Sequence, residues 1–345
     1  MTIQLSHKPQ LTDEPQLGHE LQERARSEAA QPAAAGQQAT PFVLTVACAE
    51  RRGIVHAVSS FLAMRGFDIA EHQQFDDHVS NTLFLRTAFT GTLAGSTGST
   101  GAAGSSNPSG TASAGGNGAA STADSLSADF AEIAGEFGMS YSFHDDKPQR
   151  ILVMVSKFGH CLNDLIFRWR AGSLGADIAA VVSNHETLRP MAEAAGLPFI
   201  HVPVTASTKG QAESRLLELV DEYDADLVVL ARYMQVLSDG LCEQLHGRAI
   251  NIHHSFLPGF KGAKPYHQAY ERGVKLVGAT AHYVTGDLDE GPIIEQEVFR
   301  VDHSVDPDSL VTAGRDAEAI ALSRAVKWHC QHRVLLNGTR TVVFR

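Results

Sequence analysis

The positions of apolar residues along the chain predict two regions with different architectures. In the first region, short runs rich in β-branched and aromatic residues alternate with segments of helical spacing. They predict the order strand, helix, strand, strand, helix, strand over residues 41–50, 51–66, 67–77, 81–90, 124–138 and 139–145. This βαββαβ order is typical of a ferredoxin-like α/β module.

Both helices of this module have one apolar face. The faces consist of Ile54, Val58, Phe61 and Leu62 in the first helix and of Leu126, Phe130, Ile133 and Phe137 in the second. Between the third strand and the second helix, residues 91–125 are almost entirely Gly, Ser, Ala and Thr. Such a composition buries too little apolar surface to offset the entropy of ordering, so we predict a flexible loop inserted into one module.

The second region alternates apolar strands with amphipathic helices. Strands are predicted at 151–156, 176–184, 198–203 and 225–231, and the helices between them at 160–172, 187–196 and 210–223. The alternation predicts a doubly wound, mostly parallel sheet with right-handed crossovers. Ligands of such sheets bind beyond the carboxyl ends of the strands. No G-x-G-x-x-G follows the first strand, so a dinucleotide is not predicted.

Polar side chains follow another apolar run, at residues 249–260 (AINIHHSFLPGF). Asn251 and His253 are two residues apart on this strand and therefore project from one face. His282 lies in a β-like run, and the turn after it, TGDLDEGP, carries Asp287, Asp289 and Glu290. An amide that donates to a developing oxyanion, an imidazole that moves a proton and a carboxylate that supports it are suited to acyl transfer or acyl hydrolysis.

Other interpretations of these residues are open. Asn251 and the aspartates of the turn are residue types that also cap strands and form turns without further function. A metal site is the second alternative, with His253, His254, His282 and Asp289 as ligands. There is no H-x-H or H-E-x-x-H motif, and the consecutive pair of histidines faces opposite ways on a strand. The residues alone indicate an α/β enzyme with possible acyl chemistry.

Composition excludes several classes. The net charge is -11 and no basic block is present, so nucleic acid is not an expected partner. No run of about 18 apolar residues predicts a transmembrane helix, so we expect no membrane association. Residues 1–40 lack an apolar core and are expected to be a disordered tail. Cys48, Cys161, Cys242 and Cys330 are far apart, which favours a reducing, cytoplasmic location.

Beyond these patterns, the chain resembles a known family. The segment INIHHSFLPGFKGAKPYHQAYERGVKLVGATAHYVTGDLDEGPII resembles the catalytic segment of enzymes with the 10-formyltetrahydrofolate-using formyltransferase fold. SKFGHCLNDLIFRW and the final segment GRDAEAIALSRAVKWHCQHRVLLNGTRTVVF are similar to the formyltetrahydrofolate deformylases within that group. The resemblance covers residues 41–345 without the insert. It implies an ACT-like regulatory domain at 41–145 and a catalytic domain at 150–345, although Glu50 stands where the ACT pattern has Asp.

The resemblance also implies an activity. It implies hydrolysis of 10-formyltetrahydrofolate to tetrahydrofolate and formate, which would supply formate for purine biosynthesis and balance the folate pool. The family's catalytic Asn, His and Asp fall on Asn251, His253 and Asp289. The implied substrate-binding residues are His282, Met234, Gln235, Val236, Leu237, Thr285, Gly286, Asp287 and Leu288. No cofactor or metal is implied, and an amino-acid effector and a homo-oligomer are the expected partners of the ACT-like domain.

Three alternatives to hydrolysis stay open at this point. A formyltransferase for glycinamide ribonucleotide would hold the phosphate of its substrate at the turn where this chain has His160 and Cys161. Both residues are bulky, and the thiol of Cys161 is a weak hydrogen-bond donor. A formyltransferase for aminoacyl-tRNA would have a basic surface. A folate-binding or ACT-regulated protein without catalysis is the third. The roles of Lys157, Lys261 and Lys264 are not predicted.

Overall fold

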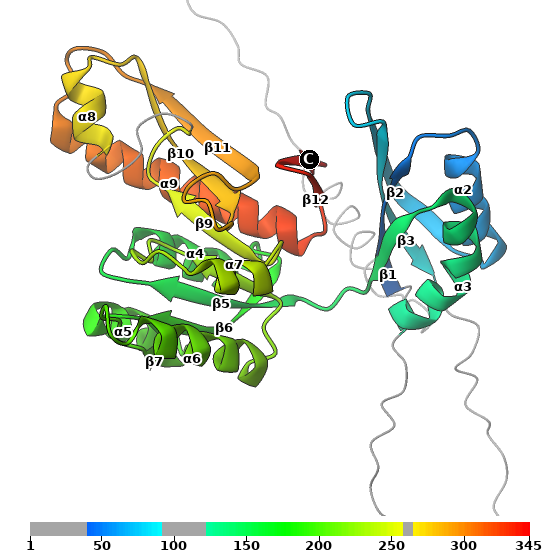
Figure 1. Cartoon of the computed structure of the whole chain (residues 1–345), viewed down its shortest axis with the longest axis horizontal. Helices are drawn as coiled ribbons and strands as arrows, with labels where there is room; N and C mark the ends of the chain where they lie inside the picture. Colours follow the sequence, from blue (N-terminus) through cyan, green and yellow to red (C-terminus); the bar gives the residue numbers. More distant parts are fainter. Residues whose placement is uncertain (1–39, 92–121, 258–264) are drawn as a thin grey trace, which may run out of the picture. The chain divides into compact units, whose positions relative to one another are not determined.

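The computed structural model describes residues 40–91, 122–257 and 265–345 (Figure 1). The predicted tail, most of the predicted Gly/Ser loop, and Lys261 and Lys264 lie outside the described residues. Within the described part, no helix combines the length and the apolar character needed to cross a membrane.

The first region has the predicted order of elements. It consists of β1 (Thr40–Ala49), α2 (Ile54–Met64), β2 (Asp68–Asp77), β3 (Thr82–Gly91), α3 (Thr122–Phe137) and β4 (Ser140–His144). The sheet order is β2-β3-β1-β4, with antiparallel pairing throughout. β2, which follows α2, pairs with β3, and β4, which follows α3, pairs with β1. This is the arrangement of a βαββαβ module.

The predicted helix faces form the core of this module. Alternate residues of β1, Phe42, Leu44 and Val46, point into it. Phe61 of α2 meets Phe130 of α3 edge to face, with ring centroids 4.9 Å apart. Gly66 has a φ of 76° just after α2, which is the left-handed conformation expected where a glycine ends a helix.

The second region contains a seven-stranded sheet in the order β11-β10-β9-β8-β5-β6-β7. The strands are β5 (Gln149–Val155), β6 (Ala176–Ser183), β7 (Phe199–His201), β8 (Leu227–Leu230), β9 (Ala249–His253), β10 (Leu276–Tyr283) and β11 (Ile293–Arg300). Strands β5 to β9 pair in parallel, whereas β10 is antiparallel to both β9 and β11. The prediction of a mostly parallel sheet thus holds for five strands, and the complete sheet is mixed.

Helices cover both faces of this sheet (Figure 1). One face packs against α4 (His160–Arg170), η1 (Glu186–Leu188), α5 (Arg189–Ala194) and the long α9 (Pro307–Cys330). The other packs against α6 (Lys209–Glu222) and α7 (Asp239–Gln244). Alternate residues of β5 pack against the two helical layers, Val153 on one face of the sheet and Leu152 on the other. From β5 the chain first continues to β6 and β7 on one side and then returns to β8 and β9 on the other. A crevice is expected at the carboxyl ends of β5 and β8, where the direction of winding changes.

Local details complete the domain. The predicted helix 187–196 is divided: residues 186–188 form a 3₁₀ turn and the α-helix begins at Arg189, because Pro190 suits the first turn of a helix and has no N–H for an interior one. Helix α8 (Pro265–Glu271) precedes β10, and β12 (Val334–Asn337) and β13 (Arg340–Val343) follow α9. All four cysteines are buried free thiols.

Candidate active site

The predicted polar residues come together where β9 ends beside β10. The register places Asn251 opposite His282 and His253 opposite Thr280. Asn251 and His253 both line one cavity, as their spacing on the strand predicted. His253 and His282 are almost fully buried, at 4% and 2% exposure, so their interactions take place largely away from bulk water.

His282 fixes the orientation of Asn251. Nδ1 of His282 lies 2.8 Å from the carbonyl oxygen of Tyr283, which only accepts, so Nδ1 carries the proton. Burial lowers the pKa of His282, which leaves its Nε2 unprotonated. Nδ2 of Asn251 lies 3.2 Å from this Nε2 and donates to it. One N–H of the Asn251 amide is therefore committed to His282, and the other is available to a ligand.

The turn after β10 brings Asp289 to the imidazoles. Oδ1 of Asp289 is 3.1 Å from Nδ1 of His253 and 3.8 Å from Nε2 of His282. Asp289 has a φ of 59°, unusual for a residue with a side chain. Gly291 allows the turn to return close to β10, since a Cβ there would lie 1.8 Å from the carbonyl oxygen of Tyr283. The turn geometry thus depends on a glycine and a strained aspartate.

Electrostatics favour the ionised form of Asp289. Burial alone would raise the pKa of this carboxyl, but the hydrogen bond from His253 and the neighbouring imidazoles lower it overall. His253 donates from Nδ1, and its Nε2 is buried without a hydrogen-bond partner. The ring therefore directs one nitrogen to a carboxylate and leaves the other for a reacting group, an arrangement that suits proton transfer.

The loop between β8 and α7 forms another wall of the site. The backbone N–H of Met234 donates to Oγ of Ser156 over 3.0 Å, and that hydroxyl donates to Oδ1 of Asn184 over 2.7 Å. At the end of the loop, Ser238 donates from its backbone N–H to Glu213 over 2.8 Å, and its hydroxyl also donates to that carboxylate. The loop is thus tied at both ends to the parallel sheet and to α6.

These elements enclose a cavity of about 290 Å³. Every residue predicted for the site lines it: Asn251, His253 and Asp289, together with His282, Met234, Gln235, Val236, Leu237, Thr285, Gly286, Asp287 and Leu288. A small, largely apolar cavity with few polar groups at one end is typical of a site for a flat organic ligand. The structure therefore brings the predicted residues together, and their individual roles stay predictions.

Several other residues of the lining were not among the predicted catalytic and substrate-binding residues. They are Leu230, Arg232, Tyr233, Cys242, Ile252, His254 and Val284. His254 was considered only as a metal ligand, and the others apart from Arg232 are apolar residues or neighbours of predicted ones. Arg232 follows a buried apolar strand directly, and a charged residue in that position was a usable signal.

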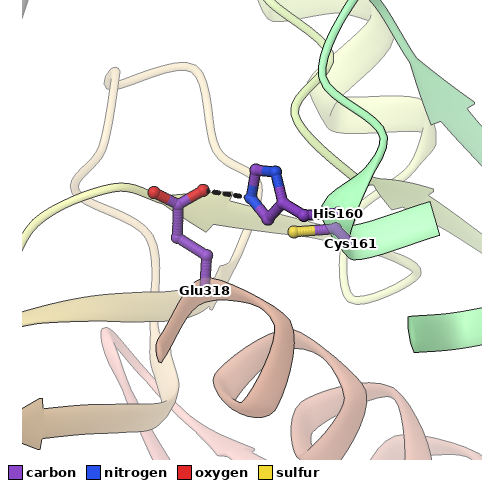
Figure 2. Close-up of side chains that lie close together, drawn as sticks. All are labelled: His160, Cys161 and Glu318. Atoms are coloured by element: carbon purple, nitrogen blue, oxygen red, sulfur yellow. Dashed lines mark hydrogen bonds and ion pairs between the residues drawn. The ribbon is translucent and has the colours of Figure 1, made fainter. Parts of the chain in front are cut away.

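A second polar cluster lies behind Arg232. Glu318 of α9 accepts from Nε2 of His160 over 2.7 Å (Figure 2). It also accepts from the hydroxyl of Tyr266 over 3.2 Å and is only 1% exposed. Nε of Arg232 lies 3.4 Å from the same carboxylate. His160 and Cys161 project from the start of α4 toward Glu318 in Figure 2.

Among the described residues, His160, Cys161 and Glu318 are the one group whose donor atoms could surround a metal ion, all lying within 4.8 Å of one another. Burial raises the pKa of the Cys161 thiol, so the sulfur stays in the form that binds metals poorly. Glu318 already has His160, Tyr266 and the guanidinium of Arg232 as neighbours. The cluster is thus organised as a protein ion-pair network, and the metal alternative of His253, His254, His282 and Asp289 does not meet the same distance condition.

The chain is similar to known proteins over most of its length. The sequence profile of the formyl transferase family matches residues 149–326. A formyltetrahydrofolate deformylase of Corynebacterium sp. (strain P-1) is 50% identical over 304 residues, covering 88% of this chain and 98% of the relative. The crystal structure of formyltetrahydrofolate deformylase from Burkholderia mallei ATCC 23344 is 49% identical, covers 89% of this chain and all of its own, and has a TM-score of 0.77.

A more distant structure matches a smaller share of the chain. It is a glycinamide ribonucleotide transformylase from Symbiobacterium toebii, 30% identical, with a TM-score of 0.56, covering 59% of this chain and 97% of its own. The chain therefore shares more of its length with the deformylases than with this transformylase.

Proposed function

Because the chain belongs to the formyltetrahydrofolate deformylases, a family of hydrolases, we propose that it hydrolyses 10-formyltetrahydrofolate to tetrahydrofolate and formate. The observation that carries the proposal is the arrangement of Asn251, His253 and Asp289 at one end of the cavity. It combines an oriented amide donor, an imidazole with a free nitrogen and an ionised carboxylate. These groups suit addition of water to a formyl group.

Each group has one role in the proposed reaction. The free N–H of Asn251 donates to the formyl oxygen as negative charge develops on it. His253 accepts a proton from the attacking water at Nε2 and stabilises the tetrahedral intermediate, while Asp289 supports the imidazolium and positions the water. The C–N10 bond then breaks, N10 takes up the proton from His253, and formate leaves after the second proton of the water has passed to solvent.

The pterin ring of the substrate occupies the apolar part of the cavity in this proposal. Its walls are the loop of Met234, Gln235, Val236 and Leu237 on one side and the turn from Thr285 to Leu288 on the other. Backbone N–H and C=O groups of an ordered loop can recognise the edge of a heterocycle while the apolar side chains cover its faces. His282 acts indirectly, by orienting Asn251.

The test is formate release from 10-formyltetrahydrofolate with neither an amine acceptor nor added metal. We expect steady formate production together with stoichiometric tetrahydrofolate. Formate production that is absent until glycinamide ribonucleotide is added, with formyl transfer to it, would contradict hydrolysis and favour a transferase. Folate binding without any turnover would indicate a protein that has lost catalysis.

We also propose that residues 40–144 form an ACT-type regulatory module. The support is the βαββαβ order with the sheet order β2-β3-β1-β4. Such a module would assemble the chain into a homo-oligomer and bind an amino-acid effector. Light scattering and activity measurements with each amino acid test this: a monomer whose activity no amino acid changes would contradict it.

The cellular role belongs to the same proposal. Formate from this reaction would feed purine biosynthesis, and the hydrolysis would balance formylated against free folate. The four free cysteines agree with work in the reducing cytoplasm. Accumulation of purine intermediates or a formate requirement in a deletion strain would support this role, and normal growth on formate-free medium under all conditions would contradict it.

A further inference from the structure

Arg232 combines three features that cost free energy. Its φ is 64°, in the left-handed region that side chains disfavour. Its side chain is only 10% exposed. Nε and Nη1 are buried and have no hydrogen-bond partner, so the charge has been desolvated without full compensation. A backbone outlier with buried, unpaired N–H donors in the wall of the cavity points to a function for the side chain.

The charges around the cavity define that function. Within the described lining, the permanently charged cation is Arg232, and the carboxylates are Asp287 and Asp289. Burial lowers the pKa of His254 to about 4, and burial also lowers that of His282, so these imidazoles are neutral near pH 7. A small anion inside the cavity is therefore repelled by Asp289 and attracted by Arg232.

Glu318 forms an ion pair with Arg232 but accepts no hydrogen bond from its Nε. Their closest approach is 3.4 Å, between Nε and Oε2, yet Nε makes no hydrogen bond. The two Glu318 oxygens are committed to His160 and Tyr266. The guanidinium carbon also lies 5.4 Å from the centre of the Phe158 ring. The guanidinium is thus positioned by a carboxylate and an aromatic ring while two nitrogens stay unpaired.

We propose that Arg232 is the binding site for the formate product, and that the ligand it recognises is a small carboxylate. The inference rests on the proposed hydrolysis, which produces such an anion beside Asp289. When water has added to the formyl carbon and the C–N10 bond has broken, N10 has one proton of the water, the other has passed to solvent, and formate carries a negative charge. A planar guanidinium matches a carboxylate. Arg232 moves formate away from N10 and from Asp289 and so opposes the reverse reaction.

Direct binding of formate, measured without folate, tests the site. ¹³C-formate is titrated against the full-length chain and followed by NMR line broadening, and formate inhibition of turnover is measured in parallel. We expect Arg232→Gln to weaken formate binding by about tenfold or more, the loss typical of a charge-assisted hydrogen-bond pair. Arg315→Gln is the matched control, because its guanidinium carbon is 5.8 Å from the same Phe158 ring but the residue is exposed. We expect no change in that variant.

Glu318→Gln separates binding from a merely structural role. Removing the negative charge beside Arg232 should tighten formate binding, whereas a structural network would be damaged by both substitutions. Formate binding that is unchanged in Arg232→Gln, or that is weakened equally in Glu318→Gln, would overturn the proposal. If Arg232→Gln does not fold, Arg232→Lys keeps the charge balance with Glu318 but lacks the planar fork, and it is expected to weaken formate binding as well.

The same measurements distinguish this site from the proposed function. A chain that binds formate through Arg232 but releases none from 10-formyltetrahydrofolate would contradict the hydrolysis and support a carboxylate site. A chain that releases formate steadily, with formate binding independent of Arg232, would retain the hydrolysis and overturn the site alone.

Discussion

Asn251 acquires its orientation from two hydrogen bonds that begin at a backbone carbonyl. Tyr283 accepts from Nδ1 of His282, which leaves Nε2 of that ring to accept from the amide. Free rotation of the amide would exchange its donor and acceptor groups, and this chain of contacts removes that freedom. At the scale of the residue, the site is thus organised by neighbours that need not touch the substrate themselves.

Asp289→Asn tests the carboxylate. We expect turnover to fall by about 10²- to 10⁴-fold, the usual contribution of acid–base groups, because an amide does not stabilise an imidazolium. The KM should change little, since the substitution preserves shape. The measurement is steady-state formate release. Asp302→Asn, which removes the charge of a carboxylate that accepts from Ser304 outside the cavity, is the control. Equal turnover in the wild type and Asp289→Asn would contradict the role.

His329 predicts a pH dependence of stability. Burial lowers its pKa to about 4, and its Nδ1 shares a 2.7 Å hydrogen bond with the hydroxyl of Tyr283. The unfolded chain has the ordinary value of about 6.5, so it binds more protons than the folded chain between these two values. The contribution of His329 to the free energy of unfolding is therefore complete above pH 6.5 and decreases as the pH falls toward 4.

The substitution His329→Gln removes this titration and retains an acceptor for Tyr283. We expect the loss of stability between pH 6.5 and 4.5 to be smaller in this variant than in the wild type. Denaturant unfolding at a series of pH values measures it. Parallel curves for the two proteins across that window would show that His329 does not contribute.

At the scale of the element, the loop from Arg232 to Leu237 and the turn from Val284 to Asp289 both line the cavity. Both are held by specific contacts rather than by regular pairing. Ser156 and Glu213 fix the loop, and the close approach of Gly291 to Tyr283 fixes the turn. Loops placed on a rigid sheet in this way carry function while the strands provide position.

Ser238→Ala tests the loop. Its hydroxyl accepts from the N–H of Leu241 at the start of α7 and donates to Glu213. Loss of the cap should cost about 1 kcal/mol of stability, and the freed loop should also raise the KM for the folate substrate. Asp306→Ala is the matched control, because Asp306 caps α9 through the N–H of Ser309 and does not line the cavity. It should lower stability similarly with an unchanged KM. A raised KM in both variants would contradict a specific role of the loop.

At the scale of the whole molecule, the site depends on the order of strands in one sheet. β9 lies between parallel β8 and antiparallel β10, and residues of β9, of the loop after β8 and of the turn after β10 line one cavity. Asn251 and Asp289 are far apart in sequence, and only this order brings them together. The family similarity over nearly the full chain accords with this arrangement.

The Gly/Ser-rich insert gives a prediction at this scale. Deletion of residues 96–122 should leave formate release nearly unchanged, since a segment of this composition contributes little apolar surface to any core. Activity and solubility of the deletion variant are compared with those of the wild type. Phe130→Ala serves as the contrast, because it removes a fully buried ring from the core of that module and should cost about 3–5 kcal/mol. Insoluble or inactive deletion variants would contradict the prediction.

The sequence by itself determined the elements and the chemistry of the candidate residues. Periodicity located the elements of the first region and those of the second region from β5 to β8, because the spacing of apolar positions reflects local geometry. The pair Asn251 and His253 was visible for the same reason, since alternate residues of a strand share a face. Motif resemblance selected Asp289 among the acidic residues of the turn and added the substrate-binding residues.

Only the tertiary structure decided the rest. The antiparallel position of β10, the orientation of Asn251 by His282, and the cluster of His160, Arg232 and Glu318 join residues that are distant along the chain. No periodicity encodes such contacts, because they arise from strand order and loop closure rather than from local spacing. The unpaired guanidinium of Arg232 was likewise hidden, since burial and hydrogen bonding are properties of the folded chain.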